Sequence, residues 1–202
     1  MQTIRGFTLI ETIAVLGISS VLLALAMSAW QPYVQASRIS SAMNLVLGSL
    51  QRARAQAITS HHRVVICRSV APNIDPPACS GAATSGYAGA DWAAGWIVFA
   101  KAPANDTSTA FEPGDLVIGR QMPLATGRPT DARAVVWSNG SPQSFFFNDV
   151  GIMGGTARTF RIDHVADPLA FAGELVSERA RGIAISFQGR ARVFRKSDPE
   201  PD

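Results

Sequence analysis

Two arginines at alternate positions form the constellation in this chain most suited to chemistry. Gly189-Arg190-Ala191-Arg192 lies in a segment where apolar and polar residues alternate. Residues two apart in a strand share one face and lie about 6.6–6.8 Å apart, which is similar to the spacing of neighbouring phosphates along a nucleic-acid strand. Guanidinium groups bind phosphate through paired hydrogen bonds. The pattern therefore predicts electrostatic contact with the phosphates of a nucleic acid, without sequence preference.

The surroundings of this pair both support and weaken that prediction. A strand over residues 181–194 directs Ile183, Ile185, Phe187, Ala191 and Val193 to the core and the two arginines to solvent. Gly189 leaves room for a close approach. Further cations flank the pair: Arg179, Arg181, Arg195 and Lys196. Two alternatives stay open, a charged edge strand that resists aggregation and arginine contacts to a neighbouring subunit. The acidic residues Asp198, Glu200 and Asp202 weaken a DNA surface.

Overall charge adds little to this prediction. Lysine and arginine total 18 against 15 acidic residues, so the net charge is only +3. Two of the 18 are lysines, Lys101 and Lys196, and the rest are arginines. A high arginine content also accompanies a GC-rich genome, so it does not identify a partner by itself.

The residue types that enzymes need are not assembled in this sequence. Three histidines occur, of which His61 and His62 are adjacent near an expected helix end and His164 stands apart. There is no glycine-rich phosphate loop, H-E-x-x-H motif or G-x-S-x-G motif. We expect no catalytic site, no metal site and no cofactor.

Two cysteines, Cys67 and Cys79, are separated by eleven residues that include three prolines. Outside the cytoplasm, a disulfide between them is the natural interpretation. By the chain-entropy model, closing such a loop contributes roughly 3 kcal/mol to stability. The alternative is a pair of unrelated buried thiols.

Glu11 interrupts the apolar run from Phe7 to Trp30. As a helix these 24 residues span roughly 36 Å at about 1.5 Å per residue, enough to cross a bilayer. Arg5 precedes the run and the next cation is Arg38, which predicts a cytoplasmic N-terminus. A carboxylate inside such a helix costs about 2.5–3.5 kcal/mol. Glu11 is therefore either accidental or retained for a specific partner.

The N-terminal residues resemble the class III signal of type IV pilins and type II secretion pseudopilins. The resemblance rests on a short basic leader, Gly6-Phe7, and Glu11 at the fifth place after the glycine. It implies that prepilin peptidase cleaves between Gly6 and Phe7 and methylates the new amine. It also implies that other pilins or pseudopilins are partners and that the chain resides in the inner membrane before assembly. Glu11 would then be neutralised by the Phe7 amine of an adjacent subunit.

We expect a leader at residues 1–6, a membrane and assembly helix at 7–31, and a periplasmic globular domain at 32–202. Pro32 should kink the helix or mark its exit from the bilayer. Apolar residues then recur at spacings of three and four, which predicts an amphipathic helix over 32–60 that ends near residues 59–62.

Beyond the helix the period changes to two, which predicts antiparallel strands within a β-domain at 63–196. The expected strands are 63–67, 95–100, 115–122, 134–138, 143–148, 158–163 and 181–194. A turn at 139–142 should pair strand 143–148 back on its predecessor. The predicted fold is α+β, with a long kinked N-terminal helix packed on an antiparallel, sandwich-like β-domain. A long loop at 69–91 is expected to be pinned by the two cysteines.

This order of elements resembles GspH-type pseudopilins and FimT/FimU-type minor pilins. The matching residues include "RARAQAIT" at 52–59, "GWIVF" at 95–99 and "FNDVG" at 147–151. The resemblance implies a minor pilin in or at the tip of a pilus that helps to prime assembly. Gly189-Arg190-Ala191-Arg192 also resembles the GRxR motif of FimT-type minor pilins, which implies capture of extracellular DNA for natural transformation. The alternative is a minor pseudopilin of type II secretion that binds no DNA.

Overall fold

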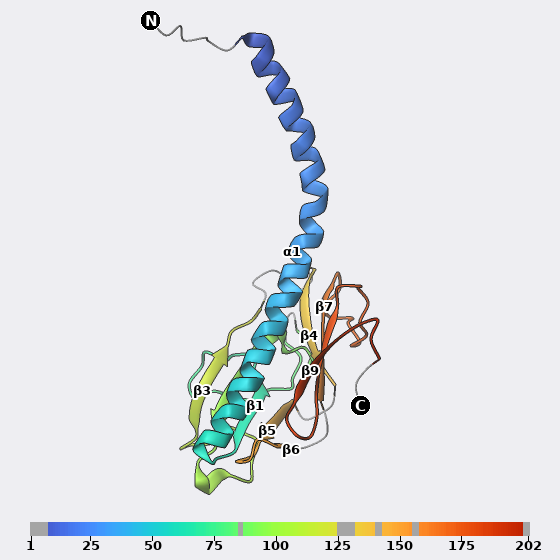
Figure 1. Ribbon diagram of the computed structural model, residues 1–202. Coiled ribbons are helices and arrows are strands. Elements are labelled where there is room, and N and C mark those ends of the chain that lie inside the picture. Colours follow the sequence, from blue (N-terminus) through green and yellow to red (C-terminus); the bar gives the residue numbers. More distant parts are fainter. Residues whose placement is uncertain (1–7, 85–86, 125–131, 140–142, 155–157, 200–202) are drawn as a thin grey trace, which may run out of the picture. The chain divides into compact units, whose positions relative to one another are not determined.

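The structure is a computed structural model that describes residues 8–84, 87–124, 132–139, 143–154 and 158–199. The chain divides into two compact units, which meet between Ser37 and Arg38 and are described separately. Helix α1 (Leu9–Ser60) contributes to both units (Figure 1). The two sheets of antiparallel strands belong to the second unit. The α+β architecture predicted from the sequence is confirmed.

The first unit is helical over its described residues from Leu9 onward. Its stretch Leu9–Met27 has a mean hydropathy of 2.2 and is long and apolar enough to cross a membrane. The helix begins with a hydrogen bond in which the Glu11 amide donates to Thr8 Oγ1 at 3.4 Å, a side-chain cap of the first turn. Pro32 lies within α1, and the kink expected there stays a prediction.

In the second unit, the remainder of α1 buries one face. The spacing of three and four residues selected from sequence is the spacing of the buried positions, Ile39, Ala42, Val46, Leu50, Ala53 and Ala57. The helix ends at Ser60, within the expected range. His61 follows with φ of 56°, so it adopts the left-handed conformation common just after a helix.

The first sheet has the order β3-β2-β1-β5-β6 and the second has the order β4-β7-β8-β9. All described pairings are antiparallel. The first sheet contains β1 (Val64–Arg68), β2 (Trp96–Ala100), β3 (Leu116–Gln121), β5 (Ser144–Phe147) and β6 (Met153–Gly154). The second contains β4 (Arg133–Ser138), β7 (Arg158–Val165), β8 (Arg181–Ile185) and β9 (Ala191–Arg195). Two short 3₁₀ helices, η1 (Trp92–Ala94) and η2 (Pro103–Asn105), lie in the connections.

One hydrophobic core joins α1 to both sheets (Figure 1). At its centre the ring of Trp92 meets the ring of Phe160 edge-on, with centroids 5.2 Å apart, and Phe145 packs beside both. The indole of Trp96 donates to Ser49 Oγ at 3.0 Å and so ties β2 to α1. The buried residues of this core come from elements far apart in sequence, so the helix and sheets are held as one body within this unit.

A second, smaller cluster covers the other face of the first sheet. It contains Val65, Cys67, Ile97 and Phe99, with Cys79 and Phe111 packed against it. Cys67 and Cys79 form the expected disulfide, so the alternative of two separate thiols is excluded. The loop at 69–91 is also held by Arg68, which was not anticipated. Its buried guanidinium donates to four carbonyl oxygens along the loop, those of Ser80, Ala82, Ala88 and Asp91.

The predicted pairing of segment 143–148 with segment 134–138 is wrong. Among the described strands, β4 pairs with β7 in the second sheet, whereas β5 pairs with β1 and β6 in the first. Both strands face the shared core, through Val136 and through Phe145 and Phe147. An alternating pattern shows which side chains are buried but not which neighbour supplies the backbone hydrogen bonds. The turn residues 140–142 lie outside the described residues.

Candidate functional site

The segment expected as one strand over 181–194 is a hairpin, so that prediction is wrong. β8 and β9 pair with each other, from Arg181 opposite Arg195 to Ile185 opposite Ala191. The turn is closed by the Ser186 amide donating to the Arg190 carbonyl at 3.0 Å. Gly189 has φ of 72°, a left-handed conformation that reverses the chain direction. Apolar and polar residues alternate on both sides of the turn, so the sequence pattern does not reveal where the chain reverses.

The space beside Gly189 is filled by the chain itself. A Cβ atom at this position would lie 2.4 Å from the Gly151 carbonyl oxygen and 3.1 Å from Arg54 Nε. Arg54 Nε in turn donates to the Gly151 oxygen at 3.1 Å. Gly189 therefore lets the hairpin turn pack against the segment after β5 and against α1. The close approach predicted for this glycine is intramolecular, which corrects its suggested role of making room for DNA.

Arg190 and Arg192 are both exposed at the turn end of the hairpin. Neither side chain makes an ion pair within the described part of the chain. Ala191 packs against the main core, as its parity predicted. Phe187 and Val193, in contrast, are 55% and 47% exposed rather than buried. Phe187 belongs to the turn and Val193 to the last strand of its sheet, so neither is fully covered.

The other four predicted cations lie at the opposite, open end of the hairpin. Arg181 donates to the carbonyl oxygens of Arg179 and Ala180. Lys196 Nζ donates to the Val176 oxygen at 2.8 Å and to Glu178 at 3.3 Å. The Arg195 amide donates to Asp198 Oδ2 at 2.8 Å, so an acidic residue lies beside this group.

The predicted basic surface is therefore two groups of residues. One group contains Gly189, Arg190 and Arg192, and the other contains Arg179, Arg181, Arg195 and Lys196. Arg192 and Arg195 are three positions apart, which is about 10 Å along a strand. Glu178 and Asp198 bond residues of the second group, whereas no carboxylate bonds Arg190 or Arg192 among the described residues, so the first group is the better candidate for binding phosphate.

The predicted processing site, Gly6 and Phe7, lies outside the described residues. Glu11 is described and is exposed on α1 among exposed apolar side chains such as Leu9, Ile10 and Ile13. An apolar helix with one carboxylate is poorly suited to remain alone in hydrocarbon. Glu11 makes no ion pair with the residues that the structure describes.

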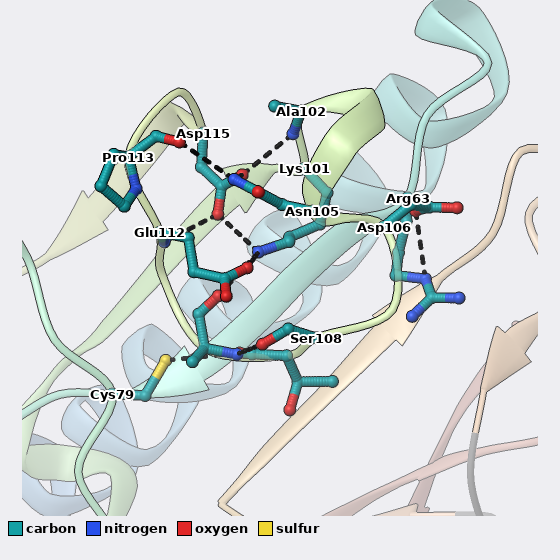
Figure 2. Close-up of polar contacts among 12 residues, drawn as sticks. Arg63, Cys79, Lys101, Ala102, Asn105, Asp106, Ser108, Glu112, Pro113 and Asp115 are labelled. Carbon is teal, nitrogen blue, oxygen red and sulfur yellow. Dashed lines mark hydrogen bonds and ion pairs between the residues drawn. The ribbon is translucent and has the colours of Figure 1, made fainter.

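Lys101 forms a buried ion cluster that the sequence analysis missed. Its ammonium donates to Ala110 O at 2.8 Å, Glu112 Oε2 at 2.8 Å and Asp115 Oδ2 at 2.6 Å (Figure 2). The side chains of Lys101 and Asp115 are both fully buried. Asp115 also accepts from the amides of Ala102 and Glu112 and from the side chain of Asn105. The cluster closes the loop between β2 and β3.

The electrostatics of Asp115 suit a structural clamp. Burial alone would raise the pKa of Asp115, but hydrogen bonds from Lys101, Ala102, Asn105 and Glu112 outweigh it and hold the pKa below its ordinary value. The carboxylate is thus kept ionised beside a lysine whose three donors are used. A signal did exist in the sequence, because Lys101 is one of two lysines and three acidic residues, Asp106, Glu112 and Asp115, follow it within 14 residues.

No group of three metal-binding side chains occurs among the residues that the structure describes. His61 and His62 lie at the end of α1 and are exposed. His164 is half-buried on β7, where burial and then the charge of Arg38 lower its pKa. His164 therefore does not form a metal-binding group with His61 and His62.

Comparison with known proteins relates both parts of the chain to one kind of assembly. Residues 42–189 match the family model described as type II transport protein GspH, and residues 1–27 match the prokaryotic N-terminal methylation motif. Comparison with curated protein sequences gives no match.

Solved structures of the type IV minor pilin FimU from Pseudomonas aeruginosa PAO1 are similar to this chain. The P21 crystal form has a TM-score of 0.51 and 17% identity, over 83% of this chain and 96% of that one. The P65 form has a TM-score of 0.47 and 17% identity, over 79% and 94%. The likeness to the P21 form, at this low identity, indicates a shared fold.

Proposed function

Because the chain belongs to the GspH family and carries an N-terminal methylation motif, we propose that it is a minor type IV pilin that is incorporated in or at the tip of a pilus and helps to prime its assembly. The observation that carries this proposal is Glu11 on an exposed apolar helix directly after the motif's Gly-Phe junction. The role is structural rather than enzymatic. Its partners are other pilins, through α1, and the prepilin peptidase.

In this proposal, residues 1–6 are the leader, residues 7–31 are the membrane and assembly helix, and residues 32–202 are the periplasmic pilin domain. Arg5 is the only cation before the apolar stretch, which supports a cytoplasmic N-terminus. The chain starts in the inner membrane as a single-pass protein and later becomes part of an extracellular pilus. The Cys67–Cys79 disulfide suits a domain outside the cytoplasm.

Processing provides the first test of this function. We expect the chain isolated from its host to begin at N-methylated Phe7, without the six residues of the leader. Changing Gly6→Lys should leave the leader attached and keep the chain out of pili, because the peptidase site is lost. Gln2→Ala, within the same leader, is the control that should be processed normally. Mass spectrometry of the intact chain gives the answer, and a chain that enters pili with Met1 still present contradicts the proposal.

A minor pseudopilin of type II secretion is the alternative subunit role, because the matched family, described as type II transport protein GspH, accommodates it as well. The two roles can be distinguished by deleting the chain and testing whether pilus formation or protein secretion is lost. Loss of surface pili with normal protein secretion supports the pilus. Loss of secretion with normal pili supports the secretion system.

DNA binding at the hairpin turn is a second function that we propose for the pilus subunit. It is supported by the exposure of Arg190 and Arg192 and by the lack of an ion pair to either within the described ranges. The partner is extracellular double-stranded DNA, bound without sequence preference for uptake in transformation. Arg179, Arg181, Arg195 and Lys196 would add a more distant positive field, which Asp198 and Glu178 reduce.

The double change Arg190→Gln and Arg192→Gln should weaken this binding strongly at low salt. Each phosphate that an arginine no longer neutralises should reduce the slope of log affinity against log salt by about 0.9, so two such phosphates reduce it by roughly 1.8. Fluorescence anisotropy of labelled duplex DNA with the full chain in detergent measures both the affinity and the slope. Arg52→Gln with Arg120→Gln removes the same charge elsewhere and should have a smaller effect. Equal effects of the two double changes would mean that the hairpin turn is not a site.

A further inference from the structure

A groove of about 270 Å³ lies between α1 and the edge of the first sheet. Leu45, Gly48 and Arg52 of α1 form one wall, and Gly119 of β3 forms part of the other. The buried side chain of Trp96 lies at its floor. All of these residues belong to the second unit, so the groove is a feature of one compact body.

Neither glycine of the groove is required by the fold. A Cβ atom on Gly48 would meet nothing within 4 Å, and one on Gly119 would meet only Arg52 Nη1 at 3.8 Å. Neither has a left-handed backbone conformation. Glycine inside a helix costs about 0.8–1.0 kcal/mol relative to alanine, and it also weakens a strand interior. Two glycines that face open space from opposite walls are suited to the close approach of another chain.

The backbone of β3 is open on the side away from β2. Among the described strands, β3 pairs only with β2, so its outward amides and carbonyls can accept another strand. Leu116, at the start of this edge, is 67% exposed. An edge of this kind favours the addition of an extended segment, in which backbone hydrogen bonds supply affinity and alternate side chains supply specificity.

The charge of the side chains at the groove indicates which kind of side chain a bound segment carries. Arg52 is exposed and makes no hydrogen bond or ion pair in the part of the chain that the structure describes. Arg120, on the neighbouring strand residue, is already bonded to Asp75. Arg52 is therefore the guanidinium at the groove that can receive a carboxylate.

We propose that an extended, carboxylate-bearing segment of a neighbouring pilin subunit adds to the β3 edge. Its small or apolar side chains lie over Gly48 and Gly119, and its carboxylate binds Arg52. A helix satisfies its own backbone groups and cannot use the edge amides of β3, so an extended segment is the occupant that suits this edge. This proposal rests on the proposed function, because it assumes that the chain assembles with other pilins.

The test uses the full chain in its host, with a photo-crosslinking amino acid in place of Leu45. After irradiation, mass spectrometry identifies the crosslinked peptide. We expect an acidic, extended segment of another pilin subunit. Gly48→Leu fills the groove and should reduce this crosslink at least tenfold without lowering the unfolding temperature, because leucine favours the helix. Arg52→Glu should also reduce it. Ala55→Leu, which places the same side chain at an exposed position elsewhere on α1, should leave it unchanged.

Other products would overturn the proposal. A crosslink to lipid, to a helical segment or to β3 of a second copy would name a different occupant, and a crosslink that survives Gly48→Leu would not come from the groove. A second crosslinker in place of Leu16 separates this failure from failure of the proposed function. Capture of a pilin helix at position 16 with none at position 45 rejects only the groove. Absence of pilin capture at both positions rejects the pilin role as well.

Discussion

Replacing Lys101 with methionine should lower the free energy of unfolding of the second unit by about 3–5 kcal/mol. The ammonium of Lys101 is the cation that neutralises the fully buried carboxylate of Asp115, at 2.6 Å. Methionine keeps much of the side-chain volume but leaves that carboxylate buried without a counter-charge. It also leaves the Ala110 carbonyl and Glu112 without the donor they now share.

Denaturant unfolding of the full chain in detergent, followed by the fluorescence of the buried Trp92 and Trp96, measures this change. Lys196→Met is the matched control, because the only other lysine is exposed and bonds Glu178 at 3.3 Å. Its effect should stay within about 1 kcal/mol. The double change Lys101→Met and Asp115→Asn should recover part of the stability, since it removes the unpaired charge. Equal destabilisation by the two lysine changes would show that the buried cluster is not a clamp.

The same cluster should make stability sensitive to acid. The pKa of Asp115 lies below its ordinary value in the folded chain, so unfolding is accompanied by proton uptake at low pH. The contribution is complete above about pH 4, the ordinary range of an aspartate, and is lost as pH falls through the lower, folded-state value. The Lys101→Met and Asp115→Asn double variant should show a weaker pH dependence in this range.

Replacing Glu11 with glutamine should reduce the amount of the chain in assembled fibres at least tenfold while its level in the membrane stays unchanged. Glutamine matches the size and shape of glutamate but cannot neutralise an ammonium group. In a single helix, the Phe7 amine lies four residues away, about 6 Å along the axis. A neighbouring helix shifted along the axis can bring its own amine beside Glu11. The charge then selects one register of docking and removes the cost of a lone carboxylate.

The control for this change is Glu178→Gln, which removes an exposed carboxylate of the globular unit. It should leave incorporation unaffected. Quantitative blotting of sheared fibres and of membranes measures both pools for each variant. Normal incorporation of the Glu11→Gln chain would mean that the carboxylate does not set the register.

Local patterns in the sequence predicted α1 and most of the strands well. The spacing of Ile39, Ala42, Val46 and Leu50 directly reports the buried face of a helix, and β1, β2 and β7 lie close to their expected ranges. The short strand β6 was missed, because two residues carry no period. Burial is encoded residue by residue, so it can be predicted from one sequence.

Strand pairing and reversals were harder to predict, for a physical reason. β5 was expected beside β4, but β1 lies between β2 and β5 and supplies its partner. The reversal at Gly189 depends on contact with Gly151 and Arg54, which are 38 and 135 residues away. These interactions involve backbone groups that every residue carries. The residue types in the sequence therefore give little information about which strands pair or where the chain reverses.

Some candidate sites could be predicted from residue type, whereas others depend on how distant elements are arranged. Glu11 and the two cysteines were selected because unusual residue types stood in informative contexts, and the disulfide is present. The basic residues of β8 and β9 were treated as one surface, but the hairpin separates them into a turn group and an open-end group. The groove between α1 and β3 had no signature, because Gly48 and Gly119 acquire meaning only when two distant elements face each other.

We infer that this chain leaves the membrane as a subunit of a pilin fibre. The most direct measurement is the abundance and N-terminal mass of the chain in fibres purified from its own host. We expect a minor but reproducible component that begins at methylated Phe7, and we expect it to be absent from fibres made by the Glu11→Gln strain. Purified fibres that lack the wild-type chain, while the membrane contains it in full, would contradict the account.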